Sequence, residues 1–319
     1  MKLYYAPLEG LTDAIYRRVH HAMFPGADKY FMPFVSPSRS LSFTGRQLLD
    51  ISPAENAGVP AVPQVLAKNG DYFVEMAKAL QDAGYREVNL NLGCPSGTVT
   101  AKGKGAGMLK DLDALKEFLD QVYAHSPLPV SLKTRAGYER AEEWPRLLKI
   151  FIQYPVSEWI LHPRTCREFY SPAIHREFFD AARAAAPFPV IYNGNLFTRE
   201  EFQGFLSDHP NPDGVMLGRG LAVNPALIRE IQGGKPLTLE DLASFHDRLY
   251  REYLKSWPEH AVVGRMHGVM HYLCQALDTP APAARALRKS AGVQEYGDAA
   301  ARVFRESRVK AEPRFIPPV

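Results

Sequence analysis

The sequence predicts an α/β fold, a (β/α)8 TIM barrel followed by a small C-terminal helical bundle. Short apolar runs alternate with longer helical segments, and the alternation fills about 230 residues, which suits such a barrel in size and strand number. The first run leads into A-P-L-E-G-L-T-D at residues 6–13, whereas an open doubly wound sheet would carry a G-x-G-x-x-G loop there. After G-G-K-P at residues 233–236 the strand-like runs stop.

The expected strands are rich in Val, Ile, Leu and Tyr, and they lie at residues 3–6, 30–35, 62–66, 87–91, 130–134, 158–162, 190–193 and 214–217. Helices are expected between them at residues 71–83, 111–125, 142–153, 172–186 and 198–207. Asp71 and Thr198 are candidate N-caps, and Gly84 is a candidate helix stop. Strands that alternate with helices pair in parallel through right-handed crossovers.

The tail is expected to form helices at residues 239–257, 260–276, 281–291 and 298–310. The simplest organisation is a catalytic barrel domain at residues 1–234 and a helical domain at residues 235–319. The net charge of +3 lies in this second part, where 13 Lys and Arg face 10 Asp and Glu (13 − 10 = 3). Such an excess fits either a surface that attracts a polyanion weakly or a helical face that is exposed to solvent, and both interpretations stay open.

The composition is that of a soluble globular protein, with 46% apolar and 23% charged residues. No run approaches the roughly 18 apolar residues of a membrane span, and the N-terminus lacks a secretory signal. The three cysteines, Cys94, Cys166 and Cys274, are too scattered for a disulfide framework or a metal cluster. We therefore expect a cytoplasmic protein with no metal site.

Polar residues collect where the expected strands end, which is where a barrel carries its active site. They are Pro7-Leu8-Glu9, Gln64, Asn89, Asn91, Cys94, Lys133, Arg135, His162, Arg164, Asn193-Gly194-Asn195 and Gly218-Arg219-Gly220. Glycines after the last two expected strands are typical of a phosphate-binding site in barrel enzymes. After the last strand, an arginine stands between two such glycines.

Two of these residues allow several chemical roles. Lys133 ends a buried strand, so it fits either the cationic neighbour of a reduced flavin or the Schiff-base lysine of an aldolase. Cys94, in N-L-N-L-G-C-P-S, fits a buried filler, a nucleophile or a general acid.

Seven collinear motifs resemble the signature series of the tRNA-dihydrouridine synthases. They are A-P-L-E-G-L-T-D (6–13), N-L-N-L-G-C-P-S (89–96), K-G-A-G (104–107), L-K-T-R-A-G (132–137), H-P-R-T (162–165), Y-N-G-N (192–195) and M-L-G-R-G (216–220). The series spans the expected barrel and is followed by a helical tail, as in that family. The chain departs from the family pattern at Met32-Pro33, at Pro163 and at Asn195. It also has His267 at a position where the family usually has lysine.

The resemblance implies FMN-dependent reduction of a uridine in the D-loop of tRNA, with NADPH as the reductant. It places FMN on Pro7, Leu8, Glu9, Gln64, Lys133, His162, Asn193, Gly194, Asn195, Gly218 and Arg219. Lys133 would lie at the flavin ring edge, and Gly194, Gly218 and Arg219 near the phosphate.

The resemblance also implies that Asn91 and Arg135 hydrogen-bond the uracil and that Tyr170 contacts the base or its sugar. Hydride would add to C6 of the uracil, and Cys94 would protonate C5. The target base must leave its stack to reach a barrel mouth, and the basic tail would bind the tRNA phosphates. We expect neither a membrane association nor an obligate protein partner.

Three other functions remain open at this point. An FMN-dependent barrel reductase of a small pyrimidine or enone would not need a basic tail. A sugar-phosphate aldolase that uses Lys133 would leave Cys94 and Asn91 unexplained. A tRNA-binding chaperone without catalysis would have no need of Cys94, Lys133 and Arg135.

Overall fold

The computed structural model describes residues 1–38, 43–170 and 174–316. The chain divides into two compact units. The first comprises Met1–Pro7, Asp28–Asn195 and His209–Met216, and the second comprises Leu8–Ala27, Leu196–Asp208 and Leu217–Val319. The boundary expected between residues 234 and 235 stays a prediction.

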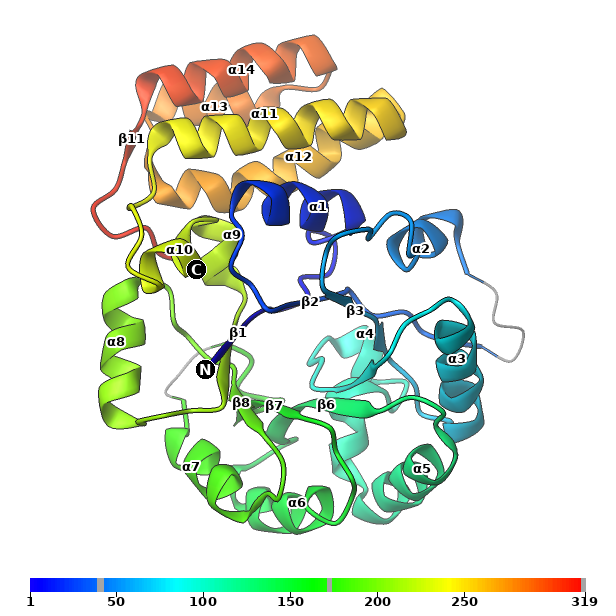
Figure 1. Cartoon of the computed structure of the whole chain (residues 1–319). Helices are drawn as coiled ribbons and strands as arrows, with labels where there is room; N and C mark the ends of the chain where they lie inside the picture. The colour runs from blue at the N-terminus through cyan, green and yellow to red at the C-terminus, as the bar shows by residue number, and fades with distance from the viewer. Residues whose placement is uncertain (39–42, 171–173, 317–319) are drawn as a thin grey trace. The chain divides into compact units, whose positions relative to one another are not determined.

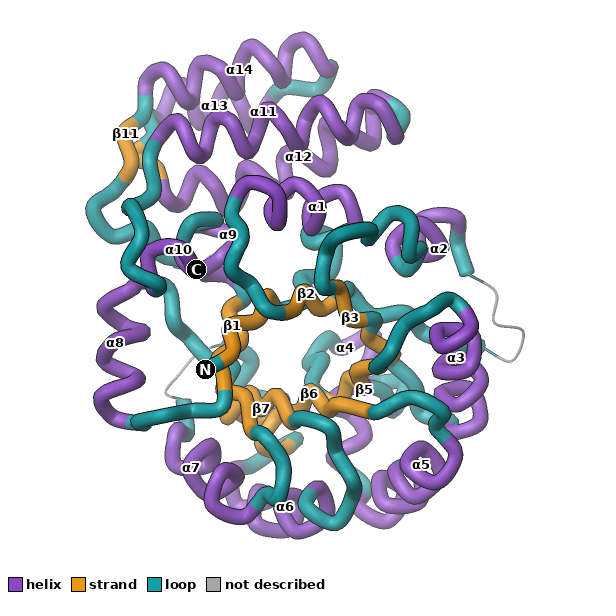
Figure 2. Tube along the Cα trace, viewed as in Figure 1, coloured by secondary structure: helices purple, strands orange, loops and turns teal. Residues whose placement is uncertain are grey.

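The first unit is built on a parallel sheet that closes into a barrel (Figure 2). Its strands are β1 (Lys2–Tyr5), β2 (Lys29–Phe31), β3 (Ala61–Val62), β4 (Gln64–Val65), β5 (Val88–Leu92), β6 (Val130–Gly137), β7 (Trp159–Thr165), β8 (Val190–Tyr192) and β9 (Gly214–Leu217). They follow the order β3-β2-β1-β9-β8-β7-β6-β5-β4. The two ends of this order, β3 and β4, are consecutive in the chain and are separated by Pro63 alone.

The expected strand at residues 62–66 is thus present in two pieces. Proline has no N–H to donate to a sheet, so the ladder is interrupted at Pro63. The piece before it pairs with β2 and the piece after it with β5. Counting β3 and β4 as one strand gives the eight-stranded TIM barrel that the sequence predicts, which confirms the fold class.

The expected strand at residues 30–35 is shorter in the structure. It ends at Phe31, and Val35 pairs with Val65 through an isolated bridge. Pro33 interrupts this ladder as Pro63 interrupts the next one.

Apolar side chains from around the ring form a buried cluster. Its members come from β1, β2, β3, β7, β8 and β9 and the residue after β1, and they are Tyr4, Ala6, Phe31, Val62, Ile160, Ile191 and Met216. Filling of this kind makes a barrel interior a packed core instead of a pore. In barrels of this kind the active site lies at the carboxyl ends of the strands.

The helices of the first unit are α2 (Gly45–Asp50), α3 (Gly70–Asp82), α4 (Gly97–Thr100), α5 (Leu112–His125), α6 (Trp144–Phe151) and α7 (Arg176–Ala185), with short 3-10 turns η1 (Gly105–Lys110) and η2 (Ala141–Glu143). Helices α3, α5, α6 and α7 lie outside the strand ring (Figure 1). Asn69, and not Asp71, caps α3, because its side chain accepts from the N–H of Tyr72. Residues 172 and 173 of the expected helix 172–186 lie outside the described residues.

The second unit is helical. It holds α1 (Ala14–Met23), α8 (Arg199–Asp208), α9 (Arg219–Val223), α10 (Leu227–Ile231), α11 (Leu239–Ser256), α12 (Glu259–Leu273), η3 (Cys274–Ala276), α13 (Ala281–Lys289) and α14 (Val293–Glu306). The expected helical tail is therefore confirmed. The helix expected at residues 298–310 was misplaced, because the chain leaves α14 at Ser307 and pairs β11 (Arg308–Val309) with β10 (Leu277–Asp278).

Helix α1 packs on the tail helix α11. The rings of Tyr16 and Phe245 meet edge to face at 5.4 Å, and the Tyr253 hydroxyl donates to Asp13 over 2.8 Å. Arg265 from α12 forms an ion pair with the same Asp13 at 3.0 Å. Among the helices that the structure describes, none combines the length and apolar character needed to cross a membrane.

A partly buried polar cluster lies near the amino ends of β2, β5 and β7. The Tyr4 hydroxyl donates to Glu158 over 2.7 Å, and the Lys29 ammonium group lies 3.0 Å from Glu158 and 2.8 Å from Glu87. Burial lowers the pKa of Lys29, but the two carboxylates outweigh this effect and raise it overall. Glu158 is 2% exposed, so its charge depends on these partners.

Replacing Glu158 should therefore destabilise the barrel. We expect Glu158→Gln to lower the free energy of unfolding by about 1–3 kcal/mol, because a buried tyrosine and a half-buried lysine lose a charged acceptor. The measurement is the midpoint of thermal unfolding. The matched control is Glu75→Gln, which removes an exposed pair with Lys78 and should cost about 0–1 kcal/mol. Equal shifts for the two variants would contradict this account.

Candidate active site

The strand register of the first unit brings the predicted polar residues to one end of the barrel. Gln64 pairs with Asn89 between β4 and β5, Asn91 with Lys133 between β5 and β6, and Arg135 with His162 between β6 and β7. Side chains two residues apart on a strand point to the same face. Residues scattered over 98 positions of the sequence (162 − 64 = 98) therefore meet at adjacent strand ends.

Amide side chains link the first two of these strands. Asn91 donates to Gln64 over 2.7 Å, Gln64 donates to Asn89 over 2.7 Å, and Asn89 donates to Ser131 over 2.8 Å. All four residues are buried. A buried chain in which each amide has a partner fixes the orientation of its members.

Asn91 also holds the turn that carries Cys94. Its side-chain oxygen accepts from the N–H groups of Gly93 at 3.0 Å and Cys94 at 2.9 Å. On the other side, the carbonyl of Cys94 accepts from the N–H of Ala106 over 3.1 Å. The half-buried Cys94 is thus held through its backbone from two directions.

Two glycines permit this close packing. A Cβ atom at Gly93 would lie 3.2 Å from the carbonyl carbon of Thr134 in the next strand. A Cβ atom at Gly105, whose φ is +56°, would lie 2.9 Å from the carbonyl oxygen of Cys94 and 3.1 Å from its Cβ. Only a residue without a side chain lets the loop after β5 fold back onto Cys94 in this way.

Lys133 places a cation beside this turn. Its ammonium group donates to Asn193 over 2.8 Å, and Asn193 in turn donates to the carbonyl of Met216 over 2.8 Å. Burial, with repulsion from Arg135, lowers the pKa of Lys133 to about 8, and Cys94 opposes this shift. Among the described residues, no carboxylate lies within 4.0 Å of this ammonium group.

Arg135 connects the loop after β5 with the end of β7 and the loop that follows it. Its guanidinium donates to the carbonyls of Gly93 at 3.1 Å, Thr165 at 2.7 Å and Phe169 at 2.9 Å. It also lies 5.4 Å from the ring of Tyr170. Arg135 thus supports the Cys94 turn from β6, a role that sequence reasoning did not anticipate. Its predicted contact with uracil stays a prediction.

The imidazole of His162 contacts an arginine of the same strand. Its Nε2 lies 3.3 Å from Arg164, whose guanidinium also donates to Asn195 over 3.3 Å. The rings of His162 and Tyr170 are 6.2 Å apart. Arg164 is 1% exposed and connects the ends of β7 and β8, so it orients both neighbours.

The remaining predicted residues are divided between the two units. Pro7 and Gly194 belong to the first, after β1 and β8, whereas Leu8, Glu9, Gly218 and Arg219 belong to the second. The guanidinium carbon of Arg219 lies 4.7 Å from the ring of Phe315 and 5.8 Å from that of Phe197. Sequence reasoning missed Phe315 because it is far from Arg219 in the chain and belongs to no motif.

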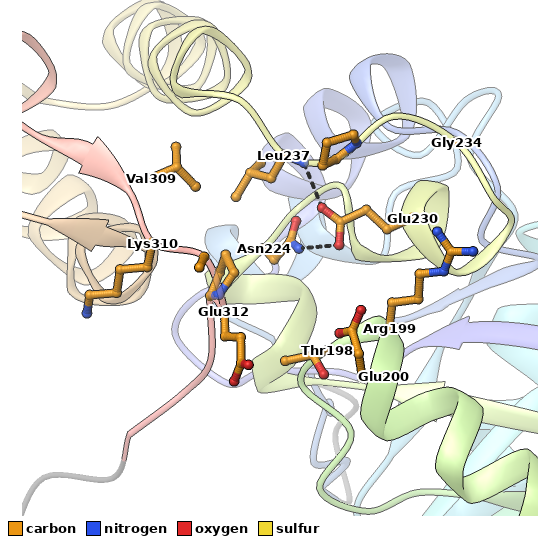
Figure 3. A pocket seen from close by; sticks show the side chains of 13 residues that line it. Thr198, Arg199, Glu200, Asn224, Glu230, Gly234, Leu237, Val309, Lys310 and Glu312 are labelled. Carbon is orange, nitrogen blue, oxygen red and sulfur yellow. Dashed lines mark hydrogen bonds between the residues drawn. The ribbon is translucent and has the colours of Figure 1, made fainter.

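A separate pocket of about 280 Å³ lies in the second unit (Figure 3). Within it, Glu230 accepts from the backbone of Leu237 at 2.6 Å and from Asn224 at 3.0 Å. Its lining also carries Arg199 and Lys310. None of the predicted site residues lines this pocket, and its mixture of charges selects no single ligand class.

Comparisons with known proteins identify the family of the chain. The model of the dihydrouridine synthase (Dus) family matches residues 4–290. A probable tRNA-dihydrouridine synthase of Staphylococcus epidermidis is 31% identical over 268 residues, 80% of this chain and 79% of the relative. One of Staphylococcus aureus is 32% identical over 263 residues, 78% of this chain and 77% of the relative.

Solved structures support the fold. A variant of NCR from Zymomonas mobilis has a TM-score of 0.52 at 15% identity, and the match covers 74% of this chain and 88% of that one. At this identity the likeness shows the barrel fold alone. The family match over nearly the whole chain goes further, and the chain belongs to the dihydrouridine synthase family.

Proposed function

We propose that this protein is a tRNA-dihydrouridine synthase, which reduces the C5–C6 double bond of a uridine in the tRNA D-loop with FMN and NADPH in the cytoplasm. The observation that carries the proposal is the juxtaposition of Cys94, on a turn held by Asn91, with the cation Lys133 in the neighbouring strand. The names of the relatives support tRNA as the substrate.

The donors at the barrel mouth fit FMN. Lys133 is a half-buried cation whose hydrogen-bond partner is the neutral amide of Asn193, so an anionic flavin edge would supply a counter-charge for it. Gln64, His162, Asn193 and Asn195 would add polar contacts from β4, β7 and β8. Pro7, Leu8, Glu9, Gly194, Gly218 and Arg219 are carried over from the resemblance. When bound, FMN supplies the electron pair for the reduction, and NADPH restores it.

The substrate base would enter beside Tyr170. This side chain is 46% exposed, and its ring lies against the guanidinium of Arg135. An exposed aromatic ring offers a stacking surface to an everted base. Asn91 and Arg135 would then bond the uracil carbonyl groups and stabilise the negative charge that develops there.

Cys94 would act as the general acid. Its thiol would give a proton to C5 of the uracil while C6 gains a hydride, and the resulting thiolate would regain a proton from water. The hydrogen bonds that hold the Cys94 backbone limit the directions in which the thiol can point. The tail at residues 235–319, which holds the excess positive charge, would bind tRNA phosphates, and no obligate protein partner is required.

The test is an assay of the purified protein with tRNA. We expect a yellow protein that forms dihydrouridine with NADPH, and Cys94→Ala should keep the flavin but react at least about 100-fold more slowly, because it lacks the proton donor. The measurements are the flavin absorbance and dihydrouridine by mass spectrometry.

The matched control is Cys274→Ala, which removes another thiol from the second unit and should react like the parent. A colourless protein, or full activity in Cys94→Ala, would contradict the proposal. Reduction of a free pyrimidine or enone with no reaction on tRNA would support a small-molecule reductase instead.

Lys133 should show its lowered pKa in the flavin-free protein. We expect its reaction with trinitrobenzenesulfonate, followed by peptide mass spectrometry, to rise with pH through a midpoint of about 8, because only the neutral amine reacts. Added FMN should protect it. A midpoint near the ordinary lysine value of about 10.4 would contradict the electrostatic description of this site.

A further inference from the structure

The lysines at and beside one motif are left without a role by the proposed function. The loop at residues 102–105, K-G-K-G, joins α4 to η1 and contains the first two residues of the K-G-A-G motif. Its end packs directly on the catalytic turn, because Ala106 donates to the carbonyl of Cys94 and Gly105 lies against the Cys94 Cβ. Whatever binds this loop is therefore close to the candidate reaction centre.

Three lysines gather at this loop, and we name Lys68, Lys102 and Lys104 the lysine cluster. Lys68 comes from the segment after β4, and its Cδ would lie 3.9 Å from a Cβ atom at Gly103. The ammonium group of Lys104 donates to the Ser36 hydroxyl over 2.5 Å, and Ser36 in turn donates to the carbonyl of Leu66 over 3.0 Å. Segments after β2, β4 and β5 thus hold the cluster at the carboxyl end of the barrel.

In the described part of the chain, no acidic side chain neutralises the positive charges of the lysine cluster. Within residues 1–38, 43–170 and 174–316, no carboxylate lies within 4.0 Å of any of the three ammonium groups. Partial burial and repulsion from Lys102 and Lys68 lower the pKa of Lys104. By contrast, Lys78 and Lys116 on nearby helices each pair with a carboxylate, at 2.7 Å and 2.9 Å. Repulsion of this kind is relieved when an anion binds.

We propose that the lysine cluster binds a backbone phosphate of the RNA substrate next to the nucleotide that reaches Cys94. The inference rests on the proposed function and deepens it. A base that enters the barrel mouth brings its own phosphodiesters to the rim, where mobile ammonium groups suit phosphate oxygens as point charges. The contact would set the position of the RNA strand without reading its sequence.

The experiment compares tRNA binding by the flavin-loaded parent, by the double variant Lys102→Gln/Lys104→Gln and by the control Lys78→Gln. Binding is measured by fluorescence anisotropy at several salt concentrations. The slope of log K against log salt should become shallower by about 1 for each lysine that contacts a phosphate. We expect this slope to become shallower by at least about 1 in the double variant and to stay unchanged in Lys78→Gln.

The position of the contact is tested with RNA in which the phosphodiesters beside the reduced uridine are uncharged methylphosphonates. The parent should bind this RNA more weakly than the normal RNA, and the double variant should show a smaller difference between the two. The proposal would be overturned if the salt slope of the double variant equalled that of the parent. It would also be overturned if the uncharged phosphodiesters weakened RNA binding equally in the parent and the double variant. In either case the proposed function would still stand.

Two further outcomes would also overturn the proposal. If the double variant lost its preference for NADPH over NADH and kept the parental salt slope, the lysines would serve the phosphate of the reductant instead of the RNA. If the parent itself did not bind tRNA, the proposed function would fail first, and this inference with it.

Discussion

The side-chain oxygen of Asn91 accepts hydrogen bonds from the backbone of both Gly93 and Cys94, and the candidate site is arranged around this contact. The same asparagine donates to Gln64, which connects the turn to the buried amide chain between β4 and β6. A turn held by a buried network has little freedom to move. The position of the Cys94 thiol is therefore a property of the barrel, and not of a flexible loop.

Two cations flank this turn, and their surroundings differ. Arg135 donates to three backbone carbonyls, which make it a structural link between the loops after β5 and β7 and leave other N–H groups of its guanidinium for a ligand. Lys133 has a neutral amide as its partner and a lowered pKa. An arginine held in this way organises a site, whereas a lysine with a neutral amide as its partner is suited to receive an anion.

Much of this arrangement follows from the sequence. The alternation of strands and helices predicts the barrel, and the polar residues at strand ends predict which side chains meet, because parallel strands bring their carboxyl ends together. The contacts across long sequence distances do not follow. The role of Arg135 in holding Gly93, the ring of Phe315 over Arg219 and the placing of Lys68 beside the loop at residues 102–105 depend on loop conformations that no local pattern specifies.

We propose that the packing of the loop at residues 104–106 on Cys94 positions the thiol for proton transfer. Gly105→Ala and Gly103→Ala test it most directly, because both glycines have positive φ angles, of +56° and +66°, and only the first lies against Cys94. The measurement is the rate of dihydrouridine formation at saturating tRNA, with the flavin content verified. We predict a loss of at least about tenfold for Gly105→Ala beyond that of Gly103→Ala, since a displaced catalytic group costs rate steeply. Equal rates in the two variants would contradict the account.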